Sequence, residues 1–512
     1  MATYQAPGVY VEQIDQVIRP IEGVGTSMAA FIGVTAEASR KRVDAATGDR
    51  VVVESRLNKL TLVTNWTQFT AIYGEFSEGA YLPDAVYNYF ANGGGPCYVL
   101  SIRALTEIDA GKAEAASASV PGEKGDAFTI TAKIPGPVGN NLAVIVSHDD
   151  DKSFTVKVGD QSVSGLTMKK SGGSHVGDAQ FDAIAIGNVG AATEMPAAGS
   201  YILSGGGVTP LSAADYVGSA AKRTGLGALE VQDDIRLVVC PDLMAGFDGS
   251  DAAKTRIKTV QEAIITHCEQ SRYRFAILDT PPGMTPDEAR EWRTYLNFDS
   301  SYAALYYPWL EVADLAQGGT KLVPPSGHLA GAYNSVDAER GVHKAPANVA
   351  LRGVLGVEME ISRTEQGTLN PLGVNCIRPF ANRGVVVWGA RTLSSDGAWR
   401  YVNVRRLFIY VAASLDAGLQ WAVFEPNNEN LWARIRRDVN SFLLTVWGNG
   451  ALFGNTSTQA FYVKCDEELN PAALRDQGQL IIEVGIAPVK PAEFVIFRLS
   501  QWAGADSSEA QA

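Results

Sequence analysis

The residues of this 512-residue chain that could do chemistry are an aspartate at the end of an apolar run, a serine close to a histidine, and a short acidic stretch. Asp279 ends its run as a magnesium-binding carboxylate would, but the sequence holds no G-x-x-x-x-G-K-[ST] loop to cradle phosphate. Ser326 and His328 are near neighbours, whereas a nucleophile and its base normally come from different elements and need a third group to orient the base. These patterns disfavour a nucleotide-dependent enzyme and a hydrolase.

Metal-binding patterns are equally weak. Residues 148–151 (His-Asp-Asp-Asp) offer oxygen ligands that calcium could use, but they lie between two expected strands and lack the spacing of a calcium loop, so we predict a solvated turn. The five histidines form no H-E-x-x-H pattern. The five cysteines are far apart and show no C-x-x-C spacing, so we expect reduced core residues. The sequence therefore predicts no metal and no cofactor.

Charge and hydropathy narrow the class of protein further. The chain has 43 basic and 56 acidic side chains, a net charge of −13, which repels nucleic acid. Its most apolar long window, residues 407–424, is interrupted by Asp416 and Gln420 and is expected to be a core segment. The first 13 residues resemble no secretion signal. We expect a folded protein that assembles in a cytosol and inserts into no membrane.

Strand-like and helix-like patterns alternate over much of the chain and must position these residues. The sequence predicts a strand at 28–34, a helix at 82–91 and a strand at 97–102. The alternation resumes with strands at 235–240, 273–279 and 302–307, and helices at 251–270 and 286–296. This order favours an α/β layer with a largely parallel sheet that is discontinuous in sequence.

A different texture separates the two halves of this layer. Residues 104–207 are rich in Gly, Ala, Ser and Asp, with alternating runs at 128–134, 142–147 and 154–158, and are interpreted as an inserted, mainly-β domain. The last third is different again. It predicts a strand at 384–388, helices at 404–423 and 429–446, and strands at 480–487 and 494–499.

Both ends of the chain carry strand-forming segments that the core does not need. Residues 7–12 are apolar and β-prone, and a polar stretch separates them from the core. Residues 494–499 have very high β-propensity and follow Pro488 and Pro491. Such strands either pair within their own subunit or add to an exposed sheet edge of another molecule, and the sequence leaves both readings open.

Several long motifs, all in one order, resemble the contractile tail sheath proteins of phages and phage-tail-like injection particles. They cover nearly all of the chain outside the insert. The N-terminal motifs are Pro7-Gly8-Val9-Tyr10-Val11-Glu12, Ala30-Phe31-Ile32-Gly33 and Cys97-Tyr98-Val99. The later ones are Pro324-Pro325-Ser326-Gly327-His328-Leu329-Ala330-Gly331, Asp337-Ala338-Glu339-Arg340-Gly341-Val342-His343-Lys344, Asn370-Pro371-Leu372-Gly373-Val374-Asn375, Val387-Trp388-Gly389-Ala390-Arg391-Thr392 and Val402-Asn403-Val404-Arg405-Arg406. Residues 39–60 are longer and more charged than the link of many relatives, and inserts vary within the family.

The resemblance implies a structural protein with an α/β (α+β) core of the tail sheath type and strands exchanged between subunits. The expected domains are an N-terminal arm (1–27), a core (28–103 plus 208–365), an outer β-rich insert (104–207) and a C-terminal, tube-facing domain (366–512). The implied donated residues are Val9, Tyr10, Val11, Glu12 and Ile14 at one end and Phe494, Val495, Ile496, Phe497 and Leu499 at the other, with Ile482, Val484 and Ile486 on the receiving strand.

The resemblance also implies partners. These are other copies of the chain, arranged as hexameric rings stacked in a helical tube, together with an inner tube protein and baseplate and terminal cap proteins. Arg434, Arg436 and Arg437 cluster on the helix at 429–446, which is either an ordinary amphipathic helix with solvated arginines or a contact with an acidic inner tube. The implied location is a phage tail or a tail-like particle, assembled in the bacterial cytoplasm and in some systems released. A self-assembling shell protein that does not contract, and an α/β hydrolase-like enzyme, are the alternatives.

Overall fold

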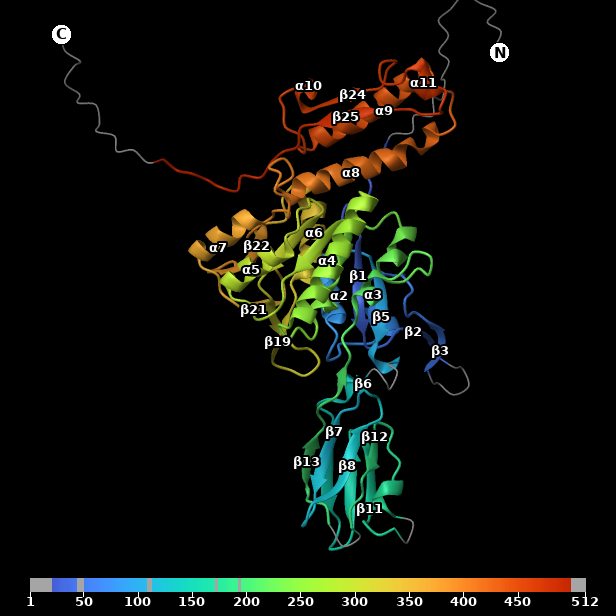
Figure 1. The fold of residues 1–512 in the computed structure, drawn as a ribbon, viewed down its shortest axis with the longest axis vertical. Coiled ribbons are helices and arrows are strands. Elements are labelled where there is room, and N and C mark those ends of the chain that lie inside the picture. Colours follow the sequence, from blue (N-terminus) through green and yellow to red (C-terminus); the bar gives the residue numbers. More distant parts are fainter. Residues whose placement is uncertain (1–20, 44–49, 108–112, 171–173, 192–194, 499–512) are drawn as a thin grey trace, which may run out of the picture.

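The computed structural model describes residues 21–43, 50–107, 113–170, 174–191 and 195–498. Three parts follow one another along the long axis of the molecule (Figure 1). An α/β core lies in the middle, a C-terminal domain built on helices α8 and α9 lies at one end, and an inserted β domain lies at the other.

The core is organised around a nine-stranded sheet with the strand order β20-β23-β22-β17-β16-β15-β1-β5-β4. Its six central strands, β22 to β5 in this order, run parallel, and the outer strands pair antiparallel. The strand bounds are β1 Ala29–Thr35, β4 Thr61–Val63, β5 Cys97–Ala104, β15 Leu237–Val239, β16 Phe275–Asp279, β17 Ala303–Tyr307, β20 Val349–Ala350, β22 Val374–Phe380 and β23 Gly384–Val387. The predicted parallel α/β layer is confirmed.

Helices cover both faces of this sheet, and alternate residues of β1 enter the two hydrophobic clusters. Ile32 packs with α4 (Asp251–Ser271) and α5 (Pro286–Leu296) on one face. Phe31 packs with α2 (Leu82–Ala91) and α6 (Ser326–Arg340) on the other. A strand covered on both faces needs a continuous apolar sequence, which is what made β1 recognisable. The two helices α2 and α6 can approach closely because Gly327 has no Cβ atom. A Cβ at this position would lie 2.4 Å from the Cα atom of Ala85.

Shorter elements complete the core. They are the hairpin of β2 (Ser39–Val43) and β3 (Arg50–Ser55), α1 (Trp66–Tyr73), α3 (Ala213–Val217), the sheet of β18 (Leu310–Ala313), β19 (Thr320–Val323) and β21 (Val354–Val357), and α7 (Arg363–Leu369). The domain boundary that we expected between residues 365 and 366 is wrong. Strands β22 and β23 lie beyond it and pair with the core sheet, so the core continues to about the start of α8.

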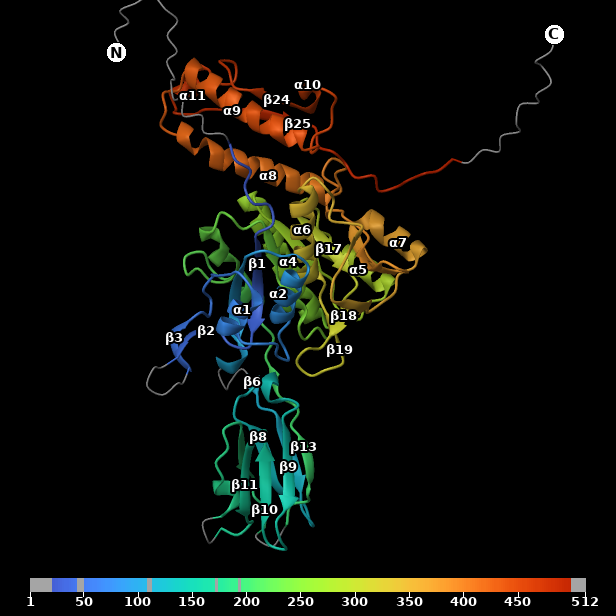
Figure 2. The ribbon, with the colours of Figure 1, turned by 180° about the vertical axis from the view of Figure 1, so that it is seen from behind.

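The inserted domain contains two sheets that enclose a hydrophobic cluster of their own. The sheet orders are β11-β10-β9-β13 and β12-β8-β7. The strands are β7 Ser117–Pro121, β8 Asp126–Ala132, β9 Ala143–His148, β10 Phe154–Val158, β11 Gln161–Leu166, β12 Ile184–Gly187 and β13 Gly199–Ile202. Strand β6 (Ala113–Glu114) leads into the domain and pairs with β14 (Gly207–Val208), which leads out (Figure 2). The predicted turn at 148–151 is confirmed between β9 and β10, where Asp150 accepts the backbone N–H of Ser153.

The C-terminal domain packs two long helices and a small sheet around a fourth cluster. Helix α8 (Val402–Leu419) lies across the end of the core, and α9 (Glu429–Gly448) lies over it (Figure 1). Strands β24 (Phe461–Lys464) and β25 (Glu483–Ile486) pair antiparallel. The short helix α10 (Ser457–Ala460) leads into β24, and α11 (Ala472–Arg475) lies between the two strands. Residues Leu431, Ile435 and Val439 on one face of α9 are buried, as its sequence pattern predicts.

Candidate functional site

The crevice in which open α/β sheets usually bind ligands is filled by one of the protein's own side chains. Strand order reverses between β1 and β15, and ligands of such sheets bind beyond the carboxyl ends of strands at this point. The carboxylate of Asp242 lies there and accepts the backbone N–H groups of Val34 (2.8 Å) and Leu82 (3.1 Å). It thus caps the N-terminus of α2, the position at which helices of other proteins can bind phosphate.

The other residues that suggested chemistry have structural roles as well. Asp279 ends β16 as predicted, and its carboxylate accepts the backbone N–H (2.9 Å) and the hydroxyl (2.6 Å) of Ser326 at the start of α6. Burial raises the pKa of both Asp242 and Asp279 to about 7. His328 is fully buried, which lowers its pKa to about 3, and its ring nitrogens have no hydrogen-bond partner among the described residues. Ser326 and His328 therefore do not form a nucleophile–base pair.

A cavity of about 730 Å³ lies beside this edge of the sheet and has an acidic lining. Lys321 is its one lining lysine among the described residues, and its ammonium group pairs with Asp84 at 2.8 Å and faces Asp314 at 3.8 Å. Within the described ranges, no three His, Cys, Asp or Glu side chains gather as metal ligands would. All five cysteines are buried and free, as predicted.

The segments predicted to be exchanged between subunits lie at the two ends of the chain. Residues 9–14, the predicted N-terminal donated strand, lie outside the described residues. The chain enters the described part against α8, where Ile21 is buried in the cluster of the C-terminal domain. A Cβ on Gly418 would lie 2.6 Å from Ile21, so the small residue makes room for this contact. The backbone N–H of Val24 donates to the Ser414 hydroxyl at 3.1 Å.

A buried ion pair locks this N-terminal segment to both the core and the C-terminal domain. Arg406 on α8 donates to both carboxylate oxygens of Asp337 on α6 at 2.9 and 2.6 Å, and the side chains are only 3% and 4% exposed. The same guanidinium donates to the Thr26 carbonyl at 3.0 Å. Sequence reasoning missed this pair, although both residues lie in the motifs that carry the family resemblance.

The predicted receiving strand has one free edge among the described residues. Strand β25 is shorter than the expected 480–487 and pairs with β24 alone. The N–H of Ala487 donates to Ala460 on the β24 side at 2.8 Å, so the alternate residues Ile486 and Val484 direct their backbone groups to the opposite edge. The side chains of Ile482, Val484 and Ile486 pack against the cluster of the C-terminal domain. The free edge therefore belongs to a strand that is firmly seated.

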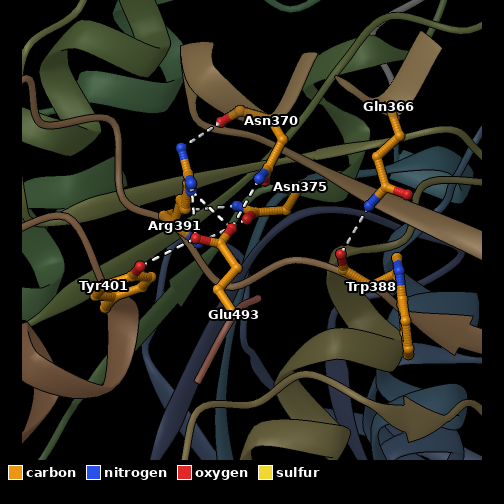
Figure 3. Close-up of polar contacts among 7 residues, drawn as sticks. All are labelled: Gln366, Asn370, Asn375, Trp388, Arg391, Tyr401 and Glu493. Carbon is orange, nitrogen blue, oxygen red and sulfur yellow. Dashed lines mark hydrogen bonds and ion pairs between the residues drawn. The ribbon is translucent and has the colours of Figure 1, made fainter. Parts of the chain in front are cut away.

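The C-terminal segment leaves the body close to this edge. Phe494, Val495, Ile496 and Phe497 are 70%, 70%, 80% and 84% exposed, and no strand pairs with them in the described part of the chain. The expected strand at 494–499 is thus an unpaired apolar segment in the isolated subunit, and Leu499 lies outside the described residues. Glu493, just before it, is bound to Arg391 of the core in a cluster that sequence reasoning did not find (Figure 3).

The three arginines of α9 have different surroundings. Arg436 is half-buried and donates to the Cys465 carbonyl. Arg434 is exposed, and its guanidinium lies 4.4 Å from the centroid of the Trp421 ring. Arg437 is 51% exposed and pairs with Asp438 at 2.9 Å. Arg434 and Arg437 are therefore available to a partner, whereas Arg436 supports the fold of its own domain.

Comparisons with known proteins give these features a context. The phage tail sheath protein central domain matches residues 211–393, and the phage tail sheath C-terminal domain matches residues 394–501. A prophage protein of Pseudomonas aeruginosa (strain UCBPP-PA14), named as a major tail sheath protein, is 27% identical over 300 residues, which are 56% of this chain and 72% of that protein. The tail sheath protein of Vibrio phage KVP40 is 23% identical over 391 residues, which are 70% of this chain and 55% of that protein.

The structural similarity extends over almost the whole chain. The sheath complex of the extracellular contractile injection system PVC in its contracted state matches with a TM-score of 0.60 and 25% identity, over 98% of this chain and 99% of that one. No helix among the described residues is long and apolar enough to cross a bilayer. The two matched domains together span more than half of the sequence and meet where the core ends. The chain belongs to the phage tail sheath protein family, whose members are structural proteins and not enzymes.

Proposed function

We propose that this chain polymerises into a helical contractile tube around an inner tube and contracts to drive that tube through a target envelope. The observation that carries the proposal is the exposed apolar segment 494–497 in a subunit whose strand β25 has a free edge. A subunit that both gives and receives a strand can join copies head to tail, and where such contacts do not close into a ring they build an open helix. The likeness to a sheath in the contracted state over 98% of the chain supports the same function.

Two donated segments per subunit give the tube its mesh. The N-terminal donor comprises Val9 to Glu12 and Ile14, and the described chain begins beside α8, within the C-terminal domain that holds β25. The C-terminal donor begins at Phe494, after the same domain. The N-terminal donor therefore precedes a segment that packs on the C-terminal domain, and the C-terminal donor follows Glu493, which the core holds. Neighbouring copies join near the place where these two parts meet.

The strength of one such link is moderate. Each backbone hydrogen bond of a donated strand contributes about 0.5–1.5 kcal/mol net, and buried apolar area adds about 25 cal/mol per Å². Many links act together through avidity, so the tube is far stronger than one contact. The extended state waits behind a kinetic barrier, and small gains in burial per subunit supply the work of contraction.

Truncation tests the donation directly. Deletion of residues 1–14, or of residues 494–512, leaves soluble monomers or short rings, whereas deletion of residues 500–512 keeps both donors and is the matched control. Negative-stain microscopy of the purified chains measures tube length and width. Long tubes from either donor deletion would contradict the proposal. With the inner tube present, assemblies of a non-contractile shell protein would keep one length, whereas a contractile tube would shorten. Tube length measured before and after treatment with detergent or acid therefore separates the two functions.

The proposed inner-tube contact is the exposed part of α9. Arg434 and Arg437 reach solvent, and Arg436, whose guanidinium binds the Cys465 carbonyl, shapes the turn beside them. An acidic tube surface is the complementary partner. Further proposed partners are other copies in hexameric rings, and baseplate and terminal cap proteins, with assembly in the bacterial cytoplasm of a phage tail or tail-like particle.

A further inference from the structure

The C-terminal segment divides sharply into a part held by its own subunit and a part that is free. The N–H of Val489 donates to Ala451 at 3.2 Å, and the Asn403 side chain donates to the Val489 carbonyl at 3.2 Å. Both contacts attach the segment to the C-terminal domain and the start of α8. Four residues further on, Glu493 is bound by the core, and the described side chains that follow it, 494–498, are exposed.

The carboxylate of Glu493 receives a full set of hydrogen bonds (Figure 3). One oxygen accepts from the Arg391 Nε atom at 2.9 Å and from the Asn370 amide at 2.7 Å. The other accepts from an Arg391 Nη atom at 2.6 Å and from the Tyr401 hydroxyl at 3.0 Å. These four donors fill the lone-pair positions of a carboxylate, and the bidentate arginine fixes its plane.

The donors of this cluster are themselves held by the core sheet. The other Nη atom of Arg391 donates to the Asn370 carbonyl at 3.1 Å, and its backbone N–H donates to the Asn375 side chain at 2.6 Å. Asn375 lies on β22 and donates to the Leu305 carbonyl of β17 at 3.1 Å. The contact therefore reaches two central strands. The Val489 carbonyl reaches the core less directly, because the Asn403 amide that binds it also donates to the His343 carbonyl at 2.8 Å.

Burial and charge keep this contact closed in the isolated subunit. The side chains of Arg391 and Glu493 are 10% and 20% exposed. Burial alone would raise the pKa of Glu493, but the hydrogen bonds from Arg391 and Asn370 outweigh it and lower that pKa, so the glutamate is ionised at neutral pH. Separation of the pair would leave a charge without a partner in a mostly buried site, which is strongly unfavourable.

We propose that the Arg391–Glu493 pair anchors the C-terminal arm to the core, so that the donated residues leave the subunit at a fixed point and a neighbour that holds them pulls on the core sheet. This inference rests on the proposed strand donation. Without the anchor, the arm would be free from Val489 onward, and the four released residues would extend its reach by about 13 Å. A longer, unordered arm loses more conformational entropy when it binds, so assembly weakens.

The test combines the mobility of the arm with the strength of assembly. A fluorophore on Phe497→Cys reports arm motion selectively because the five native cysteines are buried. Glu493→Gln removes the charge but keeps the shape, and Glu467→Gln, an exposed glutamate of the same domain, is the matched control. We expect lower fluorescence anisotropy for Glu493→Gln at a concentration below assembly. In the unlabelled chain we expect a critical concentration about tenfold higher, which corresponds to the loss of one charge-assisted hydrogen bond.

A graded series keeps the test independent of folding defects. Tyr401→Phe removes one of the four hydrogen bonds and should give a smaller change in both measurements, while the melting temperature by circular dichroism stays near that of the parent chain. Unchanged anisotropy or an unchanged critical concentration in Glu493→Gln would overturn the anchor. The donation itself would stand in that case, because it is tested separately by tube formation in the chain without residues 494–512.

Discussion

The alternation of side chains in a donated strand gives a strong prediction for residues 494–497. In an extended segment, Phe494 and Ile496 lie on one face, and Val495 and Phe497 lie on the other. When the segment pairs with the free edge of β25 in a neighbour, one face turns to the helices of the receiving domain and the other turns away from them. The perturbation is therefore a pair of double variants, Phe494→Ser with Ile496→Ser, and Val495→Ser with Phe497→Ser.

The size of the effect follows from the exposure of these side chains. They are 70% to 84% exposed in the isolated subunit, so roughly three quarters of their apolar surface is available for burial in the tube. Full burial of one large apolar side chain contributes about 1.5–3 kcal/mol, so the inward pair contributes about 2–5 kcal/mol. At about 1.4 kcal/mol per factor of ten, the critical concentration rises about 30-fold to several thousand-fold. The double variant on the face that turns away from the receiving domain changes the critical concentration by about threefold or less.

Sedimentation over a concentration series measures both values, and negative-stain microscopy checks that the pelleted material is tubular. The two double variants are controls for each other because each removes one phenylalanine and one β-branched side chain. Circular dichroism should show the same melting temperature for both, since these side chains are mostly exposed in the isolated subunit. Equal losses in both variants, or no loss in either, would refute the pairing of this segment as a regular strand.

Three further predictions concern other parts of the molecule. Arg406→Met leaves Asp337 buried without its partner and should lower the free energy of unfolding by about 3–5 kcal/mol. The double variant with Asp337→Leu should recover most of that loss. Urea denaturation of both chains measures the free energy, and an equal loss in the two would contradict the ion-pair argument. Reversal of the exposed charges with Arg434→Glu and Arg437→Glu should abolish co-assembly with an acidic inner tube but leave empty tubes intact, and co-sedimentation with the tube protein decides this. Burial raises the pKa of Asp242 from its ordinary 3.8 to about 7, so the carboxyl of the unfolded chain ionises at lower pH and the free energy of unfolding falls as the pH rises from about 4 to 7. Asp242→Asn should reduce the slope of the free energy of unfolding against pH by up to about 1.4 kcal/mol per pH unit. The same slope in both chains would show that Asp242 does not titrate in this range.

The sequence predicts the α/β layer well because its signals are local. The strand at Phe275–Asp279 is a continuous apolar run, as burial on both faces requires. Helix α5 begins and ends where its sequence predicts because Thr285 and Glu288 form a capping box around Pro286. The β2–β3 hairpin escaped prediction because the three valines of β3, residues 51–53, are exposed and follow no buried periodicity.

The features that matter most for assembly depend on contacts between distant residues. Arg406 and Asp337 are 69 positions apart, and Arg391 and Glu493 are 102 positions apart, so no spacing rule links them. The misplaced boundary at 365/366 has the same origin, because β22 joins the core only through its pairing with β17. Strand-forming character at 494–497 was visible in the sequence, but its exposure in the isolated subunit required the structure.

The long interval between neighbouring strands of the core sheet has a consequence for biosynthesis. Strand β1 pairs with β5 on one side and with β15 on the other, and the whole inserted domain is translated between β5 and β15. At about 5–20 residues per second, β15 leaves the ribosome about 7 to 27 seconds after β5. During that time β1 has no partner strand along the edge that later pairs with β15. Such an unpaired edge of a buried strand can pair with other chains. We therefore expect the nascent chain to be most prone to aggregation before residue 239 emerges, and a chaperone that covers apolar strands to raise the yield of folded subunits.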